Sequence, residues 1–315
     1  LANELGVDTI HDQMDPLGFG RLTGIDLKGE VTGILPSTEW KRKTYRRPEQ
    51  KKWYAGETIS LGIGQGYNTF TMLQIASALS TMVSDGKRFQ PRVVREIEDV
   101  VQRHRSEVSG HPLEPVPLKP EHTALIRAAM ASVAEEGTSA RVFAGAAYTS
   151  GGKTGTAQAV TLKQNEKYKA SNVDEYRRDH SLYEAFAPSE QPRVALALIV
   201  ENAGWGTAAA APIARRVLDY LLADIYPSEE DIAAVREGKA TAPIGTPRKA
   251  SEVPLPRGRD AFAMYTPVSA PKAASAASAA SAPASGASVR APIPRASVFA
   301  PPSTAPRASA PASAP

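Results

Sequence analysis

The sequence predicts an α+β fold in which an antiparallel sheet is flanked by helices. Two apolar segments of strand length, residues 182–186 and 193–201, follow each other with only a turn-rich segment between them. A helical pattern at 208–225 comes directly after them. Strands that follow strands, with a long helix at the end, favour an antiparallel sheet over alternating βαβ units.

Helical periodicity is clearest at residues 68–85, where Asn68 or Thr69 offers an N-cap oxygen and Gly86 a left-handed residue past the end. The apolar stripe of this helix is Phe70, Leu73, Ile75, Ala76, Leu79, Met82 and Val83. A second helix, at 120–136, begins with Pro120. Its expected inward residues are Leu125, Ile126, Ala129, Met130 and Val133.

Four segments read as strands. Residues 90–97 and 148–159 precede the two strands named above. The segment 193–201 is a continuous apolar run, which is typical of an interior strand covered on both faces.

Composition divides the chain in two. Residues 1–235 carry a charge of −3 and most of the core-forming side chains, whereas residues 236–315 carry +7. From Thr241 onward there are 14 of the 26 prolines, with long runs of alanine and serine. We therefore expect a folded part at 1–235 and a disordered, basic Pro/Ala/Ser-rich tail at 236–315. A polyproline ligand or a tether to an anionic surface is the alternative for the tail.

The 315 residues contain no cysteine, which excludes a disulfide framework and any cysteine-based metal site. The five histidines show no ligand-type spacing, so no metal is expected. No stretch of 18 apolar residues exists. Leu1 reads as the inside of a helix without a cap, as expected for the C-terminal piece of a longer protein.

The sharpest motif is SGGKTGTA at 150–157. A phosphate loop would need glycine where the chain has Ala147 and a helix where the following residues look extended. The alternative is a sheet strand at the border of a cleft. There Lys153 would supply a charge, Thr154 and Thr156 hydroxyl groups, and Gly155 room for a substrate backbone.

Four segments in this order resemble the class B penicillin-binding proteins: residues 23–40, 56–79, the GGKTGTAQ segment and 180–202. The insert WKRKTYRRPEQKKWY at 40–54 resembles the penicillin-binding protein 2 branch of that family. The resemblance covers residues 1–225, with Met72 where the family usually has proline. It implies a penicillin-binding, serine β-lactamase-like transpeptidase fold, incomplete at its N-terminal side.

The resemblance also implies an activity, which is peptidoglycan cross-linking by serine acyl transfer. In the family a serine in S-x-x-K is the nucleophile and S-x-N aids proton transfer. Formal S-x-x-K matches begin at Ser84, Ser150 and Ser269, but none is expected at a helix N-terminus, and no S-x-N occurs. Both motifs should precede Leu1 in the intact protein, so the fragment alone is predicted to be inactive.

By the same resemblance, Lys153 would hydrogen-bond toward the S-x-N serine, and Thr154 and Thr156 would hold the carboxylate of the stem peptide or of a β-lactam. The Thr156 amide would form half of the oxyanion hole, with Gly155 completing the K-T-G motif. Transpeptidation and carboxypeptidation are both open. A non-catalytic scaffold or a β-lactam-binding sensor on the same fold is the competing interpretation.

The partners implied are stem peptides, β-lactams, a membrane-embedded glycan polymerase and elongation-complex proteins. The family also implies an inner-membrane anchor outside this chain and a catalytic domain in the periplasm. No cofactor and no nucleic acid is implied.

Two further segments need an interpretation. Residues 62–66, GIGQG, lack the third glycine of a dinucleotide fingerprint because position 67 is Tyr67, so a tight turn near the cleft is favoured over direct substrate contact. Residues 41–52 hold seven basic side chains and one acid. A solvated loop is favoured there, ahead of a site for anionic glycan or lipid pyrophosphate, with nucleic acid last.

Overall fold

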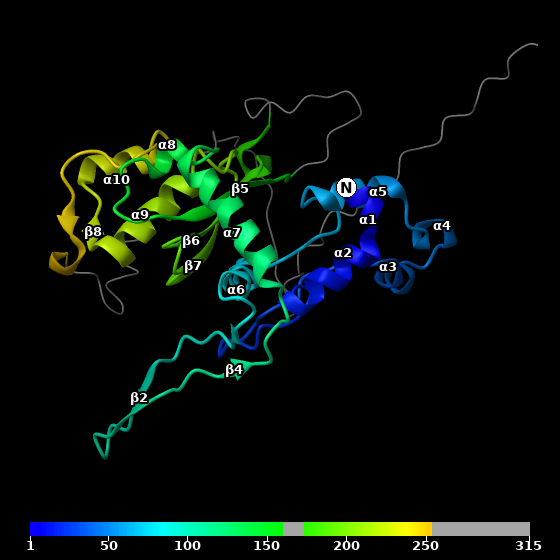
Figure 1. Cartoon of the computed structure of the whole chain (residues 1–315), viewed down its shortest axis with the longest axis horizontal. Helices are drawn as coiled ribbons and strands as arrows, with labels where there is room; N and C mark the ends of the chain where they lie inside the picture. Colours follow the sequence, from blue (N-terminus) through cyan, green and yellow to red (C-terminus); the bar gives the residue numbers. More distant parts are fainter. Residues whose placement is uncertain (160–172, 254–315) are drawn as a thin grey trace, which may run out of the picture. The chain divides into compact units, whose positions relative to one another are not determined.

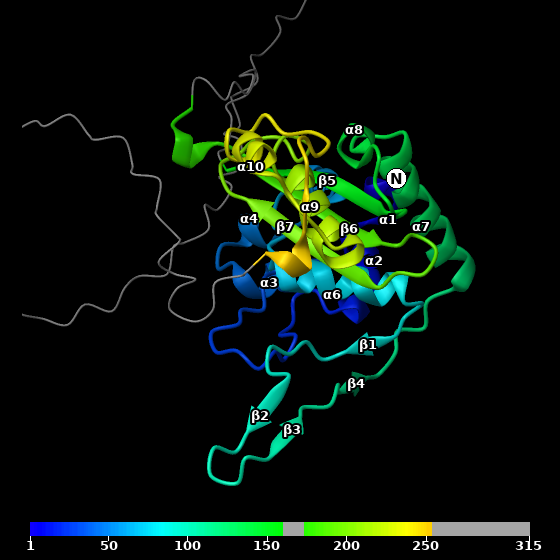
Figure 2. The ribbon, with the colours of Figure 1, turned by 90° about the vertical axis from the view of Figure 1, so that its left-hand side faces the viewer.

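The computed structural model describes residues 1–159 and 173–253. Its centre is a three-stranded antiparallel sheet in the order β5 (Gly151–Ala157), β6 (His180–Ala187) and β7 (Val194–Val200). Helices pack on both faces of this sheet (Figures 1 and 2). The α+β prediction with an antiparallel sheet flanked by helices is confirmed.

One face of the sheet is covered by α6 (Met72–Val83) and α7 (Pro120–Glu135). The fully buried Phe186 of β6 packs there against Leu79 and Val83 of α6 and Met130 of α7. Both helices were predicted, but the cap of α6 is Thr71 rather than Asn68 or Thr69. Thr69 cannot begin the helix because its backbone exchanges two hydrogen bonds with Ile34 in an isolated bridge.

The predicted inward face of α7 is wrong in its first half. Leu125 is 70% exposed and Ile126 44%, and Ala129 is also exposed. The buried residues of α7 are Thr123, Met130 and Ala134. The helix is rotated because Thr123 donates to the Asp85 carboxylate at the end of α6, which fixes that side of its first turn inward.

The other face of the sheet is covered by α8 (Ala140–Phe143) and α9 (Ala210–Ala223), which confirms the predicted C-terminal helix. Alanines of α9 lie against Tyr183 and Ala185 of β6, and small side chains let the helix approach closely. The Tyr183 hydroxyl donates to the Ser139 hydroxyl at 2.9 Å. This layer fixes the middle strand on its second face.

The predicted interior strand at 193–201 is β7, but in the described sheet it lies at the edge and pairs with β6 alone. Its side chains are only partly buried, with Ile199 37% exposed. The apolar run therefore predicted the strand correctly, but the prediction that it lies in the sheet interior with both faces covered is wrong. The strand predicted at 148–159 is β5.

The strand predicted at 90–97 is wrong as a continuous element. Instead β1 (Arg88–Phe89) pairs with β4 (Pro112–Leu113), and β2 (Glu96–Glu98) pairs with β3 (Arg105–Glu107). Between them the amides of Val93 and Val94 donate to the Asp26 carboxylate at 2.7 and 2.9 Å. These amides are therefore unavailable to a strand ladder.

The N-terminal part is helical, with short helices that precede α6. They are α1 (Ala2–Leu5), α2 (Val7–Met14), η1 (Asp15–Leu17), α3 (Thr38–Thr44), α4 (Pro48–Lys51) and α5 (Ala55–Gly62). One more short helix, η3 (Glu175–Arg177), precedes β6. No helix in the described ranges is long and apolar enough to cross a bilayer.

After α9 the chain continues through β8 (Ile225–Tyr226), α10 (Glu229–Arg236), β9 (Arg248–Lys249) and η4 (Ala250–Glu252). The strands β8 and β9 pair, and the first compact unit extends to Val253. Residues 236–253, which composition assigned to the tail, thus belong to that unit. The rest of the predicted tail, 254–315, lies outside the described residues.

Candidate active site

The K-T-G-T segment lies within β5, as the sequence predicted, and β6 fixes its register. Lys153 lies opposite Glu184, Thr154 opposite Tyr183, Gly155 opposite Leu182 and Thr156 opposite Ser181. Alternation along a strand places Lys153 and Gly155 on one face and Thr154 and Thr156 on the other. Lys153 is exposed, and the three residues after it are half-buried. The strand therefore presents one ammonium group and two hydroxyl groups at accessible positions.

In the described sheet β5 pairs with β6 alone, so its second edge is not occupied by a strand. A side chain from far away in the sequence reaches it: Gln65 Nε2 donates to the carbonyl oxygen of Thr156 at 2.7 Å. The N–H and C=O groups of one residue in an extended strand point to the same edge. The amide of Thr156 therefore points to the same side as the Gln65 amide group.

Gln65 belongs to the GIGQG turn after α5, in which Gly64 and Gly66 have positive φ angles of 77° and 80°. The expected tight turn is confirmed, and it lies next to the K-T-G-T strand. Sequence reasoning missed that Gln65 contacts the K-T-G-T strand. The signal in the sequence that could have indicated this contact is that Gln65 is the one polar side chain in a segment whose glycines serve the turn.

Two other loops border the strand. The Thr138 hydroxyl lies 3.4 Å from that of Thr154. Gly206 packs so closely that a Cβ atom there would lie 2.5 Å from the Leu182 carbonyl oxygen and 2.8 Å from that of Gly155. Next to it, the carbonyl of Trp205 accepts a hydrogen bond from Ser181 Oγ at 2.9 Å, and the Trp205 side chain is exposed. These contacts fix the C-terminal half of the segment.

A carboxyl group lies across the strand from Lys153. Burial raises the pKa of Glu184 above the ordinary glutamate range, and the positive charge of Lys153 opposes that shift. Lys153 Nζ itself donates to the carbonyl of Thr154 at 2.9 Å. Sequence reasoning also missed Glu184, because only the register of β5 on β6 brings the two residues together.

The two described S-x-x-K matches fail the test of position. Ser84 is the C-cap of α6, and Ser150 is buried directly before β5. The third match, at Ser269, lies outside the described residues. A nucleophilic serine activated by a lysine one turn later requires a helix N-terminus, so neither described serine can serve.

The solvated loop predicted at 41–52 is wrong. These residues form the second half of α3, the connection that follows, and α4. Lys41 is only 3% exposed, forms an ion pair with Glu57 and lies 5.3–5.5 Å from the ring centres of Trp53, Tyr54 and Tyr67. The other six basic side chains are exposed: Arg42, Lys43, Arg46, Arg47, Lys51 and Lys52.

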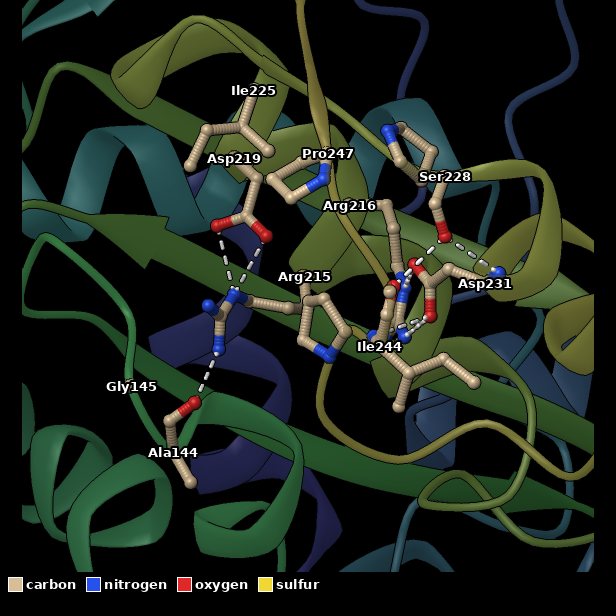
Figure 3. Close-up of a pocket in the computed structure, with 13 residues that line it drawn as sticks. Ala144, Gly145, Arg215, Arg216, Asp219, Ile225, Ser228, Asp231, Ile244 and Pro247 are labelled. Carbon is tan, nitrogen blue, oxygen red and sulfur yellow. Dashed lines mark hydrogen bonds and ion pairs between the residues drawn. The ribbon is translucent and has the colours of Figure 1, made fainter.

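A cavity of about 260 Å³ lies between α9, α10 and the segment that leads to β9 (Figure 3). Its charges are paired with each other. Arg215 Nε donates to both oxygens of Asp219 at 2.8 and 2.9 Å, and Arg216 holds Asp231 at 2.6 and 3.0 Å. The cavity is a buried salt-bridge region that ties the C-terminal elements to α9. No cluster of three His, Asp or Glu side chains suited to a metal occurs in ranges 1–159 and 173–253.

Comparison with known families gives one matching model, described as the penicillin binding protein transpeptidase domain, over residues 1–219. Among curated proteins, the chain is 39% identical over 231 residues to the peptidoglycan D,D-transpeptidase MrdA of Haemophilus influenzae. The match covers 73% of this chain and 35% of that protein. The chain thus spans about a third of the length of this curated relative.

Solved structures agree in fold. A Pseudomonas aeruginosa PBP2, in complex with WCK 5153, matches with a TM-score of 0.57 and 33% identity, over 71% of this chain and 46% of that one. A structure described as the coordination of polymerization and crosslinking by a peptidoglycan synthase complex matches with a TM-score of 0.53 and 29% identity. That match covers 68% of this chain and 32% of the other.

Proposed function

Because the chain belongs to the penicillin-binding protein transpeptidase family, we propose that it is the C-terminal part of a peptidoglycan D,D-transpeptidase. The intact enzyme cross-links stem peptides by serine acyl transfer and is acylated by β-lactams. The observation that carries the proposal is the K-T-G-T strand, in which Gln65 fixes the Thr156 carbonyl and the Thr156 amide is directed to the same edge.

The reaction has two steps. The serine oxygen attacks the carbonyl carbon of the penultimate D-Ala, the peptide C–N bond breaks, and D-Ala leaves with the serine proton on its nitrogen. The amine of a second stem peptide then attacks the ester carbon, the C–O bond breaks, and the proton returns to the serine. The nucleophile S-x-x-K and the S-x-N motif lie upstream of Leu1 in this proposal.

Each residue of the segment has a role in the first step. Thr154 and Thr156 bind the terminal carboxylate of the donor peptide, which resembles the carboxylate of a β-lactam. The Thr156 amide donates to the oxyanion that forms when the serine attacks, and loss of one such donor typically slows acyl transfer by roughly 10²–10³. Lys153 donates toward the S-x-N serine, and Gly155 keeps the strand open to the substrate.

The setting of the enzyme follows from the same family. We assign the intact protein to the inner membrane, with its catalytic domain in the periplasm and its anchor outside this chain. A membrane-embedded glycan polymerase and elongation-complex proteins are its partners. The similarity to a peptidoglycan synthase complex that couples polymerization and crosslinking supports this assignment.

Labelling with a fluorescent penicillin tests the proposal. The protein extended upstream to include the two missing motifs should form a covalent adduct that survives denaturation, whereas the chain of 315 residues should not. An extended protein that is labelled but releases neither D-Ala nor a cross-linked product from stem peptides would be a β-lactam sensor. Release of D-Ala with water as the acceptor would show carboxypeptidation. An unlabelled extended protein would refute the acyl-transfer proposal.

A further inference from the structure

Glu184 is the one acidic side chain of the middle strand, and it lies directly opposite the K-T-G-T segment. Its partner on β5 is Lys153, and its partner on β7 is Ala197. Directly opposed residues of antiparallel strands share a face and have Cβ atoms about 5 Å apart. Along β6 itself, Leu182 and Phe186 are its apolar neighbours on that face. A carboxyl group therefore occupies an apolar stripe next to the site.

The surroundings of this carboxyl group disfavour its charge. Its side chain is half-buried, and it accepts no hydrogen bond from the residues that the structure describes. Partial burial raises the pKa of Glu184, and the charge of Lys153 opposes this shift. Lys153 Nζ donates to the Thr154 carbonyl, so the two side chains are electrostatic neighbours rather than a locked ion pair.

We propose that Glu184 is a positioning residue that acts through Lys153: it offsets the charge of the lysine and so limits how strongly β5 attracts a ligand carboxylate. This inference rests on the proposed function, because the ligand is the carboxylate of a stem peptide or β-lactam. With Glu184 ionised, the pair is neutral. With Glu184 protonated, the lysine charge is unopposed and a ligand carboxylate is attracted more strongly.

The direction of the pH dependence follows. Since the pKa of Glu184 is raised, the group takes up its proton at a higher pH than ordinary glutamates, and ligand capture increases as the pH falls through that range. The other elements on this face add few charges that could compete with this effect. Neither α6 nor β7 contains an ionisable side chain. The remaining ionisable groups of β6 and α7 are His180, Tyr183, Glu121, His122, Arg127 and Glu135, of which Tyr183 lies on the opposite face of the sheet.

The first experiment uses the chain of 315 residues and needs no activity. Carbon-13 NMR of labelled glutamate carboxyl groups follows the titration of Glu184 in the wild type, in Lys153→Met and in Lys28→Met, which removes an exposed lysine elsewhere. Lys153→Met should raise the pKa of Glu184 further, whereas Lys28→Met should leave it unchanged. Equal titration in all three proteins would overturn the coupling of the two side chains.

The second experiment uses the extended protein that carries its nucleophile. Glu184→Gln should raise the second-order rate of acylation by benzylpenicillin at neutral pH about three- to tenfold at low ionic strength, with a smaller gain in high salt. It should also remove the rise at acidic pH that the proposal predicts for the wild type. Glu184→Asp should keep the wild-type profile. Glu190→Gln, an exposed carboxylate in the β6–β7 turn, is the matched control and should change neither rate nor profile.

The outcomes separate the two proposals. An extended wild type that benzylpenicillin does not acylate refutes the proposed function, while the carboxyl titration still decides whether Glu184 and Lys153 are coupled. A normal acylation rate with the same pH profile in wild type and Glu184→Gln refutes the positioning role and leaves the function intact.

Discussion

Thr156 is the residue at which the local contacts of the site converge. Its carbonyl accepts from Gln65, its side chain shares a face with Thr154, and its partner Ser181 donates to the carbonyl of Trp205. Backbone positions in an oxyanion site act through exact placement, because a donor contributes only when it points at the developing charge. Substitutions that move this backbone should therefore affect catalysis more than stability.

The Gln65 contact gives the first prediction at this scale. Gln65→Ala in the extended protein should lower the rate of acylation by penicillin about tenfold, because the edge of β5 loses its fixed partner. The loss of one hydrogen bond should cost the free energy of unfolding only about 1 kcal/mol. Stopped-flow acylation and urea unfolding measure the two effects. Gln102→Ala, in the exposed β2–β3 hairpin, is the control, and an unchanged acylation rate in Gln65→Ala would contradict the prediction.

Close packing at Gly206 gives the second prediction at the scale of single residues. Gly206→Ala would place a methyl group against the carbonyl oxygens of Leu182 and Gly155, so β5 or the loop must shift. Overpacking of this kind should lower the free energy of unfolding by about 1–3 kcal/mol. Gly56→Ala is the matched control, because a Cβ atom there meets nothing within 4 Å. Equal urea midpoints for the two variants would show that the loop yields freely.

At the scale of elements, buried ion pairs tie the C-terminal helices to the sheet domain. Arg216 of α9 donates to the carboxylate of Asp231 in α10 (Figure 3). It also donates to the carbonyl of Thr241 at 2.7 Å. Asp231 is fully buried, and its second role is to accept from the amide of Ile244 at 3.2 Å. One carboxylate thus connects α9, α10 and the segment before β9.

This geometry predicts a large effect from a single change. Asp231→Ala leaves the Arg216 guanidinium buried without its charge partner and should lower the free energy of unfolding by about 3–5 kcal/mol. Glu229 lies on the same helix, α10, and forms an exposed ion pair with Arg248, so Glu229→Ala should have little effect. Urea unfolding monitored by circular dichroism compares the two. A similar small effect from both would mean that α10 is not held through Asp231.

The elements also show what the sequence could predict. Helices α6, α7 and α9 and strands β6 and β7 follow from their apolar patterns, with Pro120 and Gly86 at helix ends, whereas β5 follows from the extended K-T-G-T segment. The exposed face of α7 and the broken strand at 90–97 could not be predicted. Thr123 with Asp85, and Asp26 with the amides of Val93 and Val94, are contacts between distant segments that override the local pattern.

The same distinction holds for the site. Lys153 to Thr156 form a recognisable motif, so their place on a strand of the sheet could be predicted. Gln65 and Glu184 have no motif of their own and join the site only through the register of β5 and the turn after α5. The roles of the four motif residues stay predictions, because they depend on a bound substrate.

For the whole molecule, family membership sharpens the interpretation of the chain. The predicted membership of the penicillin-binding proteins, with likeness to penicillin-binding protein 2, is confirmed by the family match, by curated relatives at 38–39% identity and by a PBP2 structure at 33% identity. The transpeptidase match ends at residue 219, whereas the compact unit extends to Val253. The segment from α10 to η4 thus lies beyond the matched residues, and the buried Arg216–Asp231 pair connects it to α9.

The position of the acyl adduct tests the central claim most directly. The extended protein is incubated with benzylpenicillin, digested, and its peptides are analysed by mass spectrometry to find the modified residue. The account predicts an adduct on one serine of an S-x-x-K motif upstream of Leu1, lost in Thr156→Pro, which has no amide hydrogen to donate. An adduct on any residue between Leu1 and Pro315, or no adduct in the extended protein, would contradict it.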